Sequence, residues 1–152
     1  MKILDVLDKE MILVDLAATD KIGVLTELSE PAARMTGLQS ADIVRVLLER
    51  ERLGSTGIGD GIGIPHGKIN NLDRAIMGFG LSRKGVPFES IDNRPAHLFF
   101  LLITPENATD VHLKLLARIS RMLNKETFRQ MLMNVTTSAA VMDIIHENDE
   151  SF

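Results

Sequence analysis

Runs of apolar residues along the chain predict three strands. Residues 11–16 (MILVDL) are mostly apolar and too few for a helix, which favours a strand. Residues 75–82 (AIMGFGLS) and 97–104 (HLFFLLIT) have the same character. The last run is apolar at nearly every position, which is typical of a strand in the middle of a sheet with both faces covered.

Helical spacing of apolar residues predicts five helices. The first begins near Asp20, and Pro31 either kinks it or starts a new turn. The second runs from an N-cap at Ser40 to about Leu53 and stops at Gly54. Three further helices are expected over 110–123, 125–134 and 137–146, with caps at Thr109, at Asn124 and at Thr136 or Thr137. Helices interleaved with strands predict an α/β fold, a three-layer sandwich in which a mixed sheet has helices on both faces.

Length and composition narrow the class of protein. A chain of 152 residues fits a single domain, 1–152. Seventeen basic and twenty-one acidic residues give a net charge of −4, and without a basic cluster or an aromatic platform no nucleic-acid partner is expected. The absence of cysteine favours a reducing compartment. The acidic start is not a signal peptide, and the longest apolar run, 98–103, is far shorter than the ~20 residues that span a bilayer. We therefore expect a cytoplasmic protein without membrane insertion.

The segment 54–68, GSTGIGDGIGIPHGK, contains six glycines and one histidine. It does not match the dinucleotide-binding pattern, because no register has glycine at i, i+2 and i+5. It does not match the P-loop either, because no Ser or Thr follows its Gly-Lys pair. Glycine N–H groups could instead form an anion-binding nest, with Pro65 presenting His66 on a stiffened backbone. A glycine-rich hairpin with an incidental surface histidine explains the segment equally well.

Two residues elsewhere in the chain point toward this segment. Arg50 lies at the edge of an apolar helical stripe, one turn before the glycines, although the ERER run at 49–52 is also typical of a solvated helix face. His112 continues the inward stripe of the helix 110–123. With Thr109 as N-cap, His112 is the third helical residue, where the helix dipole attracts anions and favours a neutral imidazole. The alternative is a core histidine.

The remaining candidate groups indicate no further chemistry. His97 opens a strand and His146 lies near a helix C-terminus, so both are expected to be structural. No pair of histidines has HxH or HxxxH spacing, so we expect no metal site. The methionines fit helical packing and indicate no cofactor.

The segment 50–68, RERLGSTGIGDGIGIPHGK, resembles the active-site signature of EIIA domains of the bacterial phosphoenolpyruvate-dependent phosphotransferase system (PTS). The class is type 2, which includes fructose, mannitol and nitrogen-regulatory members. The resemblance extends over 8–28 and 87–123, and so covers nearly the whole chain. Within the class, a free-standing chain of this size with GSTGIG before the histidine is most similar to the nitrogen-regulatory EIIA.

The resemblance implies a phosphocarrier. His66 would accept a phosphoryl group from a phosphohistidine of an HPr-like protein, attacking through Nε2 while a hydrogen bond holds the other ring nitrogen. His112 would support the phosphate and Arg50 would neutralise its charge, without a metal or cofactor. The surrounding phosphate-binding loop would comprise Ser55, Thr56, Gly57, Gly59, Gly61 and Gly63. Two departures from the common family pattern, Asp60 and Gly63, could alter transfer rates.

Three roles are consistent with the sequence. The preferred interpretation is a nitrogen-regulatory EIIA that controls other proteins through its phosphorylation state. The alternative is a sugar-specific EIIA that passes the phosphate to an EIIB partner during uptake. A third role, an interaction domain without phosphotransfer, is disfavoured because His66, Arg50 and His112 are all retained.

Overall fold

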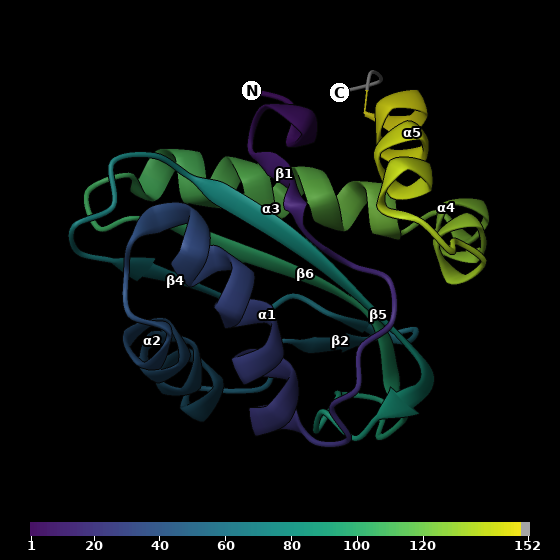
Figure 1. Ribbon diagram of the computed structural model, residues 1–152. Helices are drawn as coiled ribbons and strands as arrows, with labels where there is room; N and C mark the ends of the chain where they lie inside the picture. Colours follow the sequence, from purple (N-terminus) through teal and green to yellow (C-terminus); the bar gives the residue numbers. More distant parts are fainter. Residues whose placement is uncertain (150–152) are drawn as a thin grey trace.

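The computed structural model describes residues 1–149 as a mixed sheet with helices on both faces (Figure 1). This confirms the predicted α/β three-layer architecture. The elements follow in the order η1 (Ile3–Asp5), β1 (Leu7–Leu13), α1 (Lys21–Thr36), α2 (Ser40–Arg52), β2 (Gly57–Gly59), β3 (Ile62–Gly63), β4 (His66–Ile69), β5 (Ile76–Val86), β6 (Ala96–Pro105), α3 (Thr109–Leu123), α4 (Glu126–Met133) and α5 (Ser138–Asn148).

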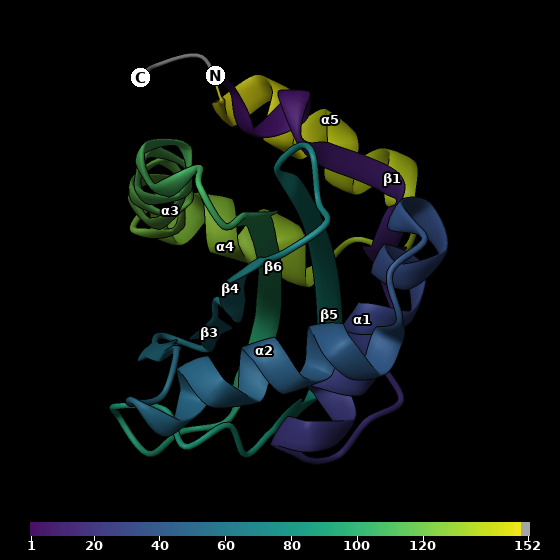
Figure 2. The ribbon, with the colours of Figure 1, turned by 90° about the vertical axis from the view of Figure 1, so that its left-hand side faces the viewer.

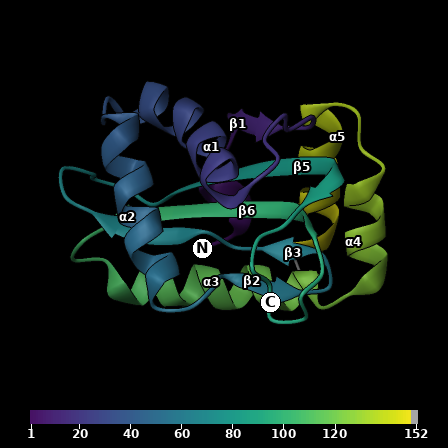
Figure 3. The same ribbon diagram turned by 90° about the horizontal axis from the view of Figure 1, so that it is seen from below.

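The sheet is organised around β6, which pairs on both sides. Its strand order is β1-β5-β6-β3-β2, and β4 also pairs with β6. The antiparallel pair β5 and β6 forms the long middle of the sheet (Figure 3). On its other side, β6 pairs in parallel first with β3, at Leu98 and Phe99, and then with β4, from Leu102 to Pro105. The predicted central position of this apolar strand is therefore confirmed.

Each face of the sheet has its own apolar core. Helices α1 and α2 cover one face, and α3, α4 and α5 cover the other (Figure 2). Adjacent side chains on β6 alternate between the two, as expected for a strand. Phe99 packs on Phe88 in one core and Phe100 on Phe79 in the other, both with ring centroids 5.1 Å apart. A strand filled on both faces needs an uninterrupted apolar sequence, which residues 98–103 provide.

The helices lie close to their predicted positions. Asp20 caps α1, its Oδ1 accepting from the Gly23 N–H at 2.7 Å, and the helix continues through Pro31. Thr137 caps α5 as predicted. Every helix within residues 1–149 is too short or too polar to span a lipid bilayer.

Three predicted caps are wrong by one residue. Gln39 and Ala108 are the N-cap residues of α2 and α3, so Ser40 and Thr109 are already helical. Asn124 has helical backbone angles and ends α3, and Lys125 is the N-cap residue of α4. In none of these three helices does the N-cap side chain accept a cap hydrogen bond, so the sequence carried no cap signal there.

Two strand predictions need larger corrections. The first strand is Leu7–Leu13 rather than 11–16, because parallel pairing with β5 already begins at Leu7, before a register shift that accommodates the polar residues 8–10. The glycine segment, for which a phosphate-binding loop and a glycine-rich hairpin were both considered, contains the three short strands β2, β3 and β4. These strands depend on pairing with β6 and with each other, which local sequence patterns do not reveal.

Candidate active site

The structure brings the two predicted site histidines together. His66 is the first residue of β4, and His112 lies in the first turn of α3. Strand β4 runs parallel to β6, with His66 opposite Leu102. Since α3 follows β6 in the chain, the start of α3 lies next to β4. The two imidazole centroids are 5.4 Å apart.

A single hydrogen bond fixes the tautomer of His66. Its Nδ1 lies 2.7 Å from the carbonyl oxygen of Ile64. A carbonyl oxygen can only accept, so Nδ1 carries the proton and Nε2 keeps its lone pair. Burial lowers the pKa of His66 below 6.5, the Ile64 hydrogen bond opposes this, and the charge of Arg50 lowers the pKa further. At neutral pH the ring is therefore neutral, with a nucleophilic Nε2.

His112 is also neutral, but not mainly because of the helix dipole. Its side chain is buried, with Nδ1 2.7 Å from the Thr104 hydroxyl. Burial, followed by electrostatic interactions with His66 and Lys68, lowers its pKa to about 4. The backbone N–H of His112 donates to the Ala108 carbonyl oxygen. His112 is therefore the fourth helical residue rather than the predicted third, and its N–H is not free.

Arg50 lies in the last turn of α2, which packs against β4 where Val46 meets Gly67. One guanidinium N–H donates to the Gly54 carbonyl at 3.0 Å, which helps to close the end of the helix. The arginine also acts on His66 through its charge, because it lowers the pKa of that ring. Arg50 thus contributes electrostatically to the site, and its position is consistent with the predicted role.

The hydroxyl groups of the predicted phosphate-binding loop are used inside the fold. Ser55 donates to the Phe88 carbonyl at 2.9 Å and accepts from the Gly57 N–H at 3.0 Å. The buried Thr56 hydroxyl donates to the Glu51 carboxylate. Both hydroxyl hydrogens therefore already have acceptors, and a direct phosphate contact for Ser55 or Thr56 stays a prediction.

The four loop glycines lie against β6 and against the segment between β5 and β6. A Cβ on Gly57 would lie 2.5 Å from Ser90 Oγ, and one on Gly63 would lie 2.9 Å from the Phe99 ring. Added Cβ atoms on Gly59 and Gly61 would have Asp92 and His97 as their nearest neighbours, at 3.3 and 3.6 Å. Close packing explains Gly57 and Gly63, and the positive φ angles of Gly59 (92°) and Gly61 (77°) explain the other two. Phosphate binding by their N–H groups stays a prediction.

The departure at Asp60 has a local explanation. Strands β2 and β3 form an antiparallel hairpin whose two connecting residues, Asp60 and Gly61, have φ values of 56° and 77°. Two consecutive positive φ angles are typical of a type I′ turn, where Asn-Gly and Asp-Gly are both favoured. Asp60 therefore suits the turn as well as the more common asparagine would. The glycine-rich hairpin considered as an alternative is present, but its chain continues into the histidine site.

Sequence reasoning missed two charged residues near the site. Lys68 lies two residues after His66 on β4, a spacing that puts both side chains on one face of the strand, and its ammonium donates to the Thr109 hydroxyl at 3.2 Å. Glu51 belongs to the ERER run, for which a solvated helix face was the alternative interpretation, but it is only 8% exposed. The strand period could have revealed Lys68, and the four-residue spacing from Ile43 to Leu47 to Glu51 could have placed Glu51 on the buried stripe of α2.

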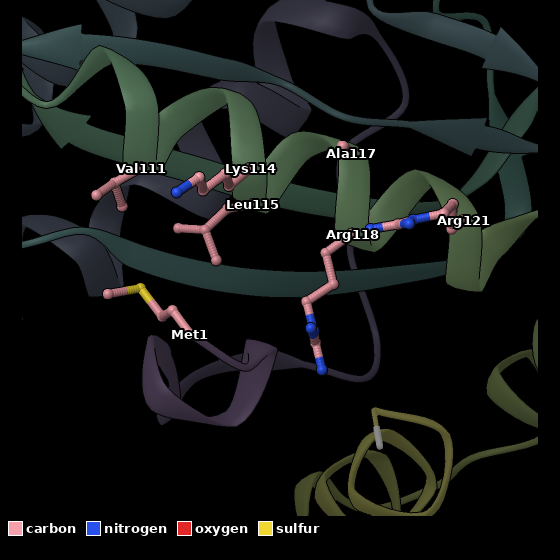
Figure 4. A pocket seen from close by; sticks show the side chains of 7 residues that line it. All are labelled: Met1, Val111, Lys114, Leu115, Ala117, Arg118 and Arg121. Carbon is pink, nitrogen blue, oxygen red and sulfur yellow. The ribbon is translucent and has the colours of Figure 1, made fainter. Parts of the chain in front are cut away.

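The histidine site is separate from the cavity beside α3. That cavity, of about 400 Å³, is lined by Met1 and by residues of α3, including Lys114, Arg118 and Arg121 (Figure 4). None of His66, His112 and Arg50 lines it. The cavity therefore adds nothing to the chemistry of the histidine pair.

Comparison with known proteins identifies the family. A sequence model described as "Phosphoenolpyruvate-dependent sugar phosphotransferase system, EIIA 2" matches residues 5–148. The chain belongs to this family. It is thus a phosphocarrier domain of the phosphotransferase system, which confirms the family resemblance drawn from the glycine segment.

The relatives of this chain include nitrogen regulatory proteins and sugar-specific EIIA proteins. A nitrogen regulatory protein of Bradyrhizobium diazoefficiens is 38% identical over 95% of each chain. A PTS system fructose-specific EIIABC component of Bacillus subtilis is 35% identical over 99% of this chain, which spans only 24% of that longer protein.

Solved structures share the fold of this EIIA domain. The crystal structure of nitrogen regulatory protein IIA-Ntr from Neisseria meningitidis has a TM-score of 0.88 and 33% identity, covering 93% of this chain and 97% of that one. A complex of Escherichia coli enzyme IIAMTL with phosphorylated enzyme IIBMTL has a TM-score of 0.77 and 20% identity, over 91% and 95% of the two chains. At that identity the second likeness shows the fold alone.

Proposed function

We propose that this EIIA domain carries a phosphoryl group on Nε2 of His66, received from a phosphohistidine of an HPr-like protein, and that its phosphorylation state controls other proteins. The observation that supports this most directly is the 2.7 Å contact between His66 Nδ1 and the Ile64 carbonyl oxygen. It leaves Nε2 as the ring nitrogen with a free lone pair. An acceptor of phosphoryl groups needs such an atom in a fixed position.

The transfer step needs no proton movement at the attacking atom. The Nε2 lone pair forms a bond to phosphorus while the phosphorus–nitrogen bond of the donor breaks, and its electron pair returns to the donor imidazole. The phosphorylated His66 ring then carries a proton on Nδ1 and more positive character than before. The Ile64 carbonyl, which accepts from Nδ1, stabilises this product.

The neighbouring groups would stabilise the charge on the transferring phosphoryl group. When the Thr104 hydroxyl donates to Nδ1 of His112, the Nε2–H of that ring is free to donate to a phosphoryl oxygen. Arg50 and Lys68 add positive charge from α2 and β4. Phosphoryl transfer depends mostly on positioning and on such charge stabilisation, and one preorganised donor contributes about 10²- to 10³-fold in rate.

The regulatory role is favoured by the degree of similarity to individual relatives. The nitrogen regulatory protein of Bradyrhizobium diazoefficiens is 38% identical to this chain, and the fructose-specific EIIABC component of Bacillus subtilis is 35% identical. The sugar-specific role remains the second candidate, because that fructose-specific protein is 35% identical over 99% of this chain. Transfer onto candidate EIIB proteins distinguishes the two: rapid transfer to one of them supports the sugar-specific role.

A phosphorelay with purified upstream proteins and labelled phosphoenolpyruvate tests the acceptor. His66→Ala should take up no label, and His112→Ala should take it up about 10²- to 10³-fold more slowly than the wild type. His146→Ala is the matched control, because this histidine is exposed on α5, and it should be labelled at the wild-type rate. Stoichiometric labelling of His66→Ala would refute the assignment.

A further inference from the structure

The Glu51 carboxylate is buried at the point where α1, α2 and the glycine segment meet. Its Oε1 accepts from the Lys21 ammonium at 3.0 Å and from the Thr56 backbone N–H at 3.1 Å. Its Oε2 accepts from the Thr56 hydroxyl. A buried carboxylate is costly unless it is paired and hydrogen-bonded, and these three donors meet that requirement.

From Glu51, hydrogen bonds lead through the backbone to the reacting ring. The Thr56 residue, held by Glu51 through both its N–H and its hydroxyl, uses its carbonyl to accept from the Ile64 N–H at 3.0 Å. The Ile64 carbonyl in turn accepts from Nδ1 of His66. Glu51 is therefore connected to His66 through two residues, and the last bond in this chain fixes the histidine tautomer.

Building on the proposed phosphoryl acceptor, we propose that Glu51 is a positioning residue for the transfer reaction. Through Thr56 and Ile64 it holds the carbonyl that keeps the proton of His66 on Nδ1. The residue does not touch the phosphoryl group. Without its carboxylate the Thr56 anchor loosens, the Ile64 carbonyl loses its fixed orientation, and a larger fraction of His66 carries its proton on the wrong nitrogen.

The negative charge of Glu51 also favours attack by His66 on phosphorus. The charged groups acting on the two histidines are Arg50 and Glu51 from α2 and Lys68 from β4. Glu51 is the acidic member of this set, and its charge raises the pKa of His66, against burial and Arg50. It therefore helps to keep the ring basic, which favours attack on phosphorus.

Lys21 pairs with the carboxylate from the other side. Its ammonium is almost buried, lies 3.3 Å from Glu89 Oε1 as well as 3.0 Å from Glu51, and sits 4.8 Å from the Phe88 ring centroid. The network thus joins the first turn of α1 to the histidine strand. Such a shell around a reactive group is what holds it in productive geometry.

Glu51→Gln tests the inference, and Glu49→Gln is its matched control. Both lie on α2, but Glu49 is exposed and contacts Arg45 at the surface. Glu51→Gln should transfer phosphate about 10- to 100-fold more slowly, the scale expected for a displaced reacting group, while Glu49→Gln transfers at the wild-type rate. Imidazole ¹⁵N NMR should show a lower His66 pKa and a larger Nε2–H population in Glu51→Gln, neither of which a general loss of stability would produce.

The outcomes separate this inference from the proposed function. If Glu51→Gln matches the wild type in rate, His66 pKa and tautomer while His66→Ala is inactive, the positioning role is refuted and the acceptor assignment stands. Labelling of His66→Ala refutes the acceptor instead. If Glu51→Gln does not fold, Glu51→Asp replaces it, because this variant keeps the negative charge but is too short to reach Thr56. It is expected to shift the His66 tautomer and to slow transfer. A wild-type tautomer and rate in Glu51→Asp would overturn the inference.

Discussion

Acidification should destabilise the protein through His112. The pKa of this histidine is about 4 in the folded chain and 6.5 when unperturbed, so the unfolded chain takes up the proton first. Above pH 6.5 the ring is neutral in both states and contributes nothing to the pH dependence. Stability is lost as pH falls below 6.5, and the loss levels off below 4, at about 3 kcal/mol in total. Between pH 7 and pH 5 the same linkage gives about 2 kcal/mol.

Urea unfolding at pH 7 and pH 5 measures this loss. A change of about 2 kcal/mol moves the midpoint by roughly 1 M, given m-values of 1–3 kcal/mol/M. His112→Gln lacks the titrating ring but keeps all other titrating groups. Between pH 7 and pH 5 its free energy of unfolding should therefore fall by about 2 kcal/mol less than that of the wild type. His146→Gln, at an exposed position of α5, should behave like the wild type. Equal losses in the wild type and in His112→Gln would refute the reasoning.

Two further predictions probe how α2 is placed against the histidine strand. A Cβ on Gly67 would lie 2.5 Å from Val46 Cγ1, so Gly67→Ala should destabilise by about 1–3 kcal/mol in urea unfolding. In the double mutant with Val46→Ala, the loss in free energy of unfolding should be at least about 1 kcal/mol smaller than the sum of the losses in the two single mutants. Strictly additive losses would contradict a contact between residues 46 and 67. Arg50→Met should raise the pKa of His66 in an NMR titration, because the arginine charge lowers it. Arg52→Met, at an exposed position of the same helix, should leave that pKa unchanged, and equal His66 values in both variants would show that Arg50 does not act on the ring.

The longer elements could be predicted from the sequence because their signals are local. An apolar run long enough to contribute to both cores indicated β6, and helical periodicity indicated the five α-helices found within residues 1–149. Asp20 and Thr137 are true caps, since their side chains accept from N–H groups three residues on. The cap residues before α2, α3 and α4 could not be predicted, because their side chains make no such bond.

The short strands of the glycine segment depend on distant partners. β2 and β3 contain three and two residues, too few for any alternation of polar and apolar side chains to appear. They form because β3 and β4 pair with β6, more than 30 residues later in the chain. The apolar runs that predicted the other strands therefore gave none in this segment, where the structure has part of the sheet.

The site was predicted in part. Helical spacing pointed His112 inward and brought Arg50 toward the glycines, and the structure places His112 beside His66. The burial of Glu51 follows from its position four residues after the buried Leu47, but its partners Lys21 and Thr56 come from other elements and could not be foreseen. The low pKa of His112 likewise follows from tertiary burial rather than from its position on the helix.

The central claim is that Nε2 of His66 accepts the phosphoryl group while Nδ1 keeps its proton on the Ile64 carbonyl. NMR of the ¹⁵N-labelled, phosphorylated protein tests it directly, since coupling between ³¹P and ¹⁵N identifies the bonded nitrogen. The expected result is one phosphorus atom bonded to Nε2 of His66, with Nδ1 still protonated. Phosphorus bonded to Nδ1, or to any residue other than His66, would contradict the account.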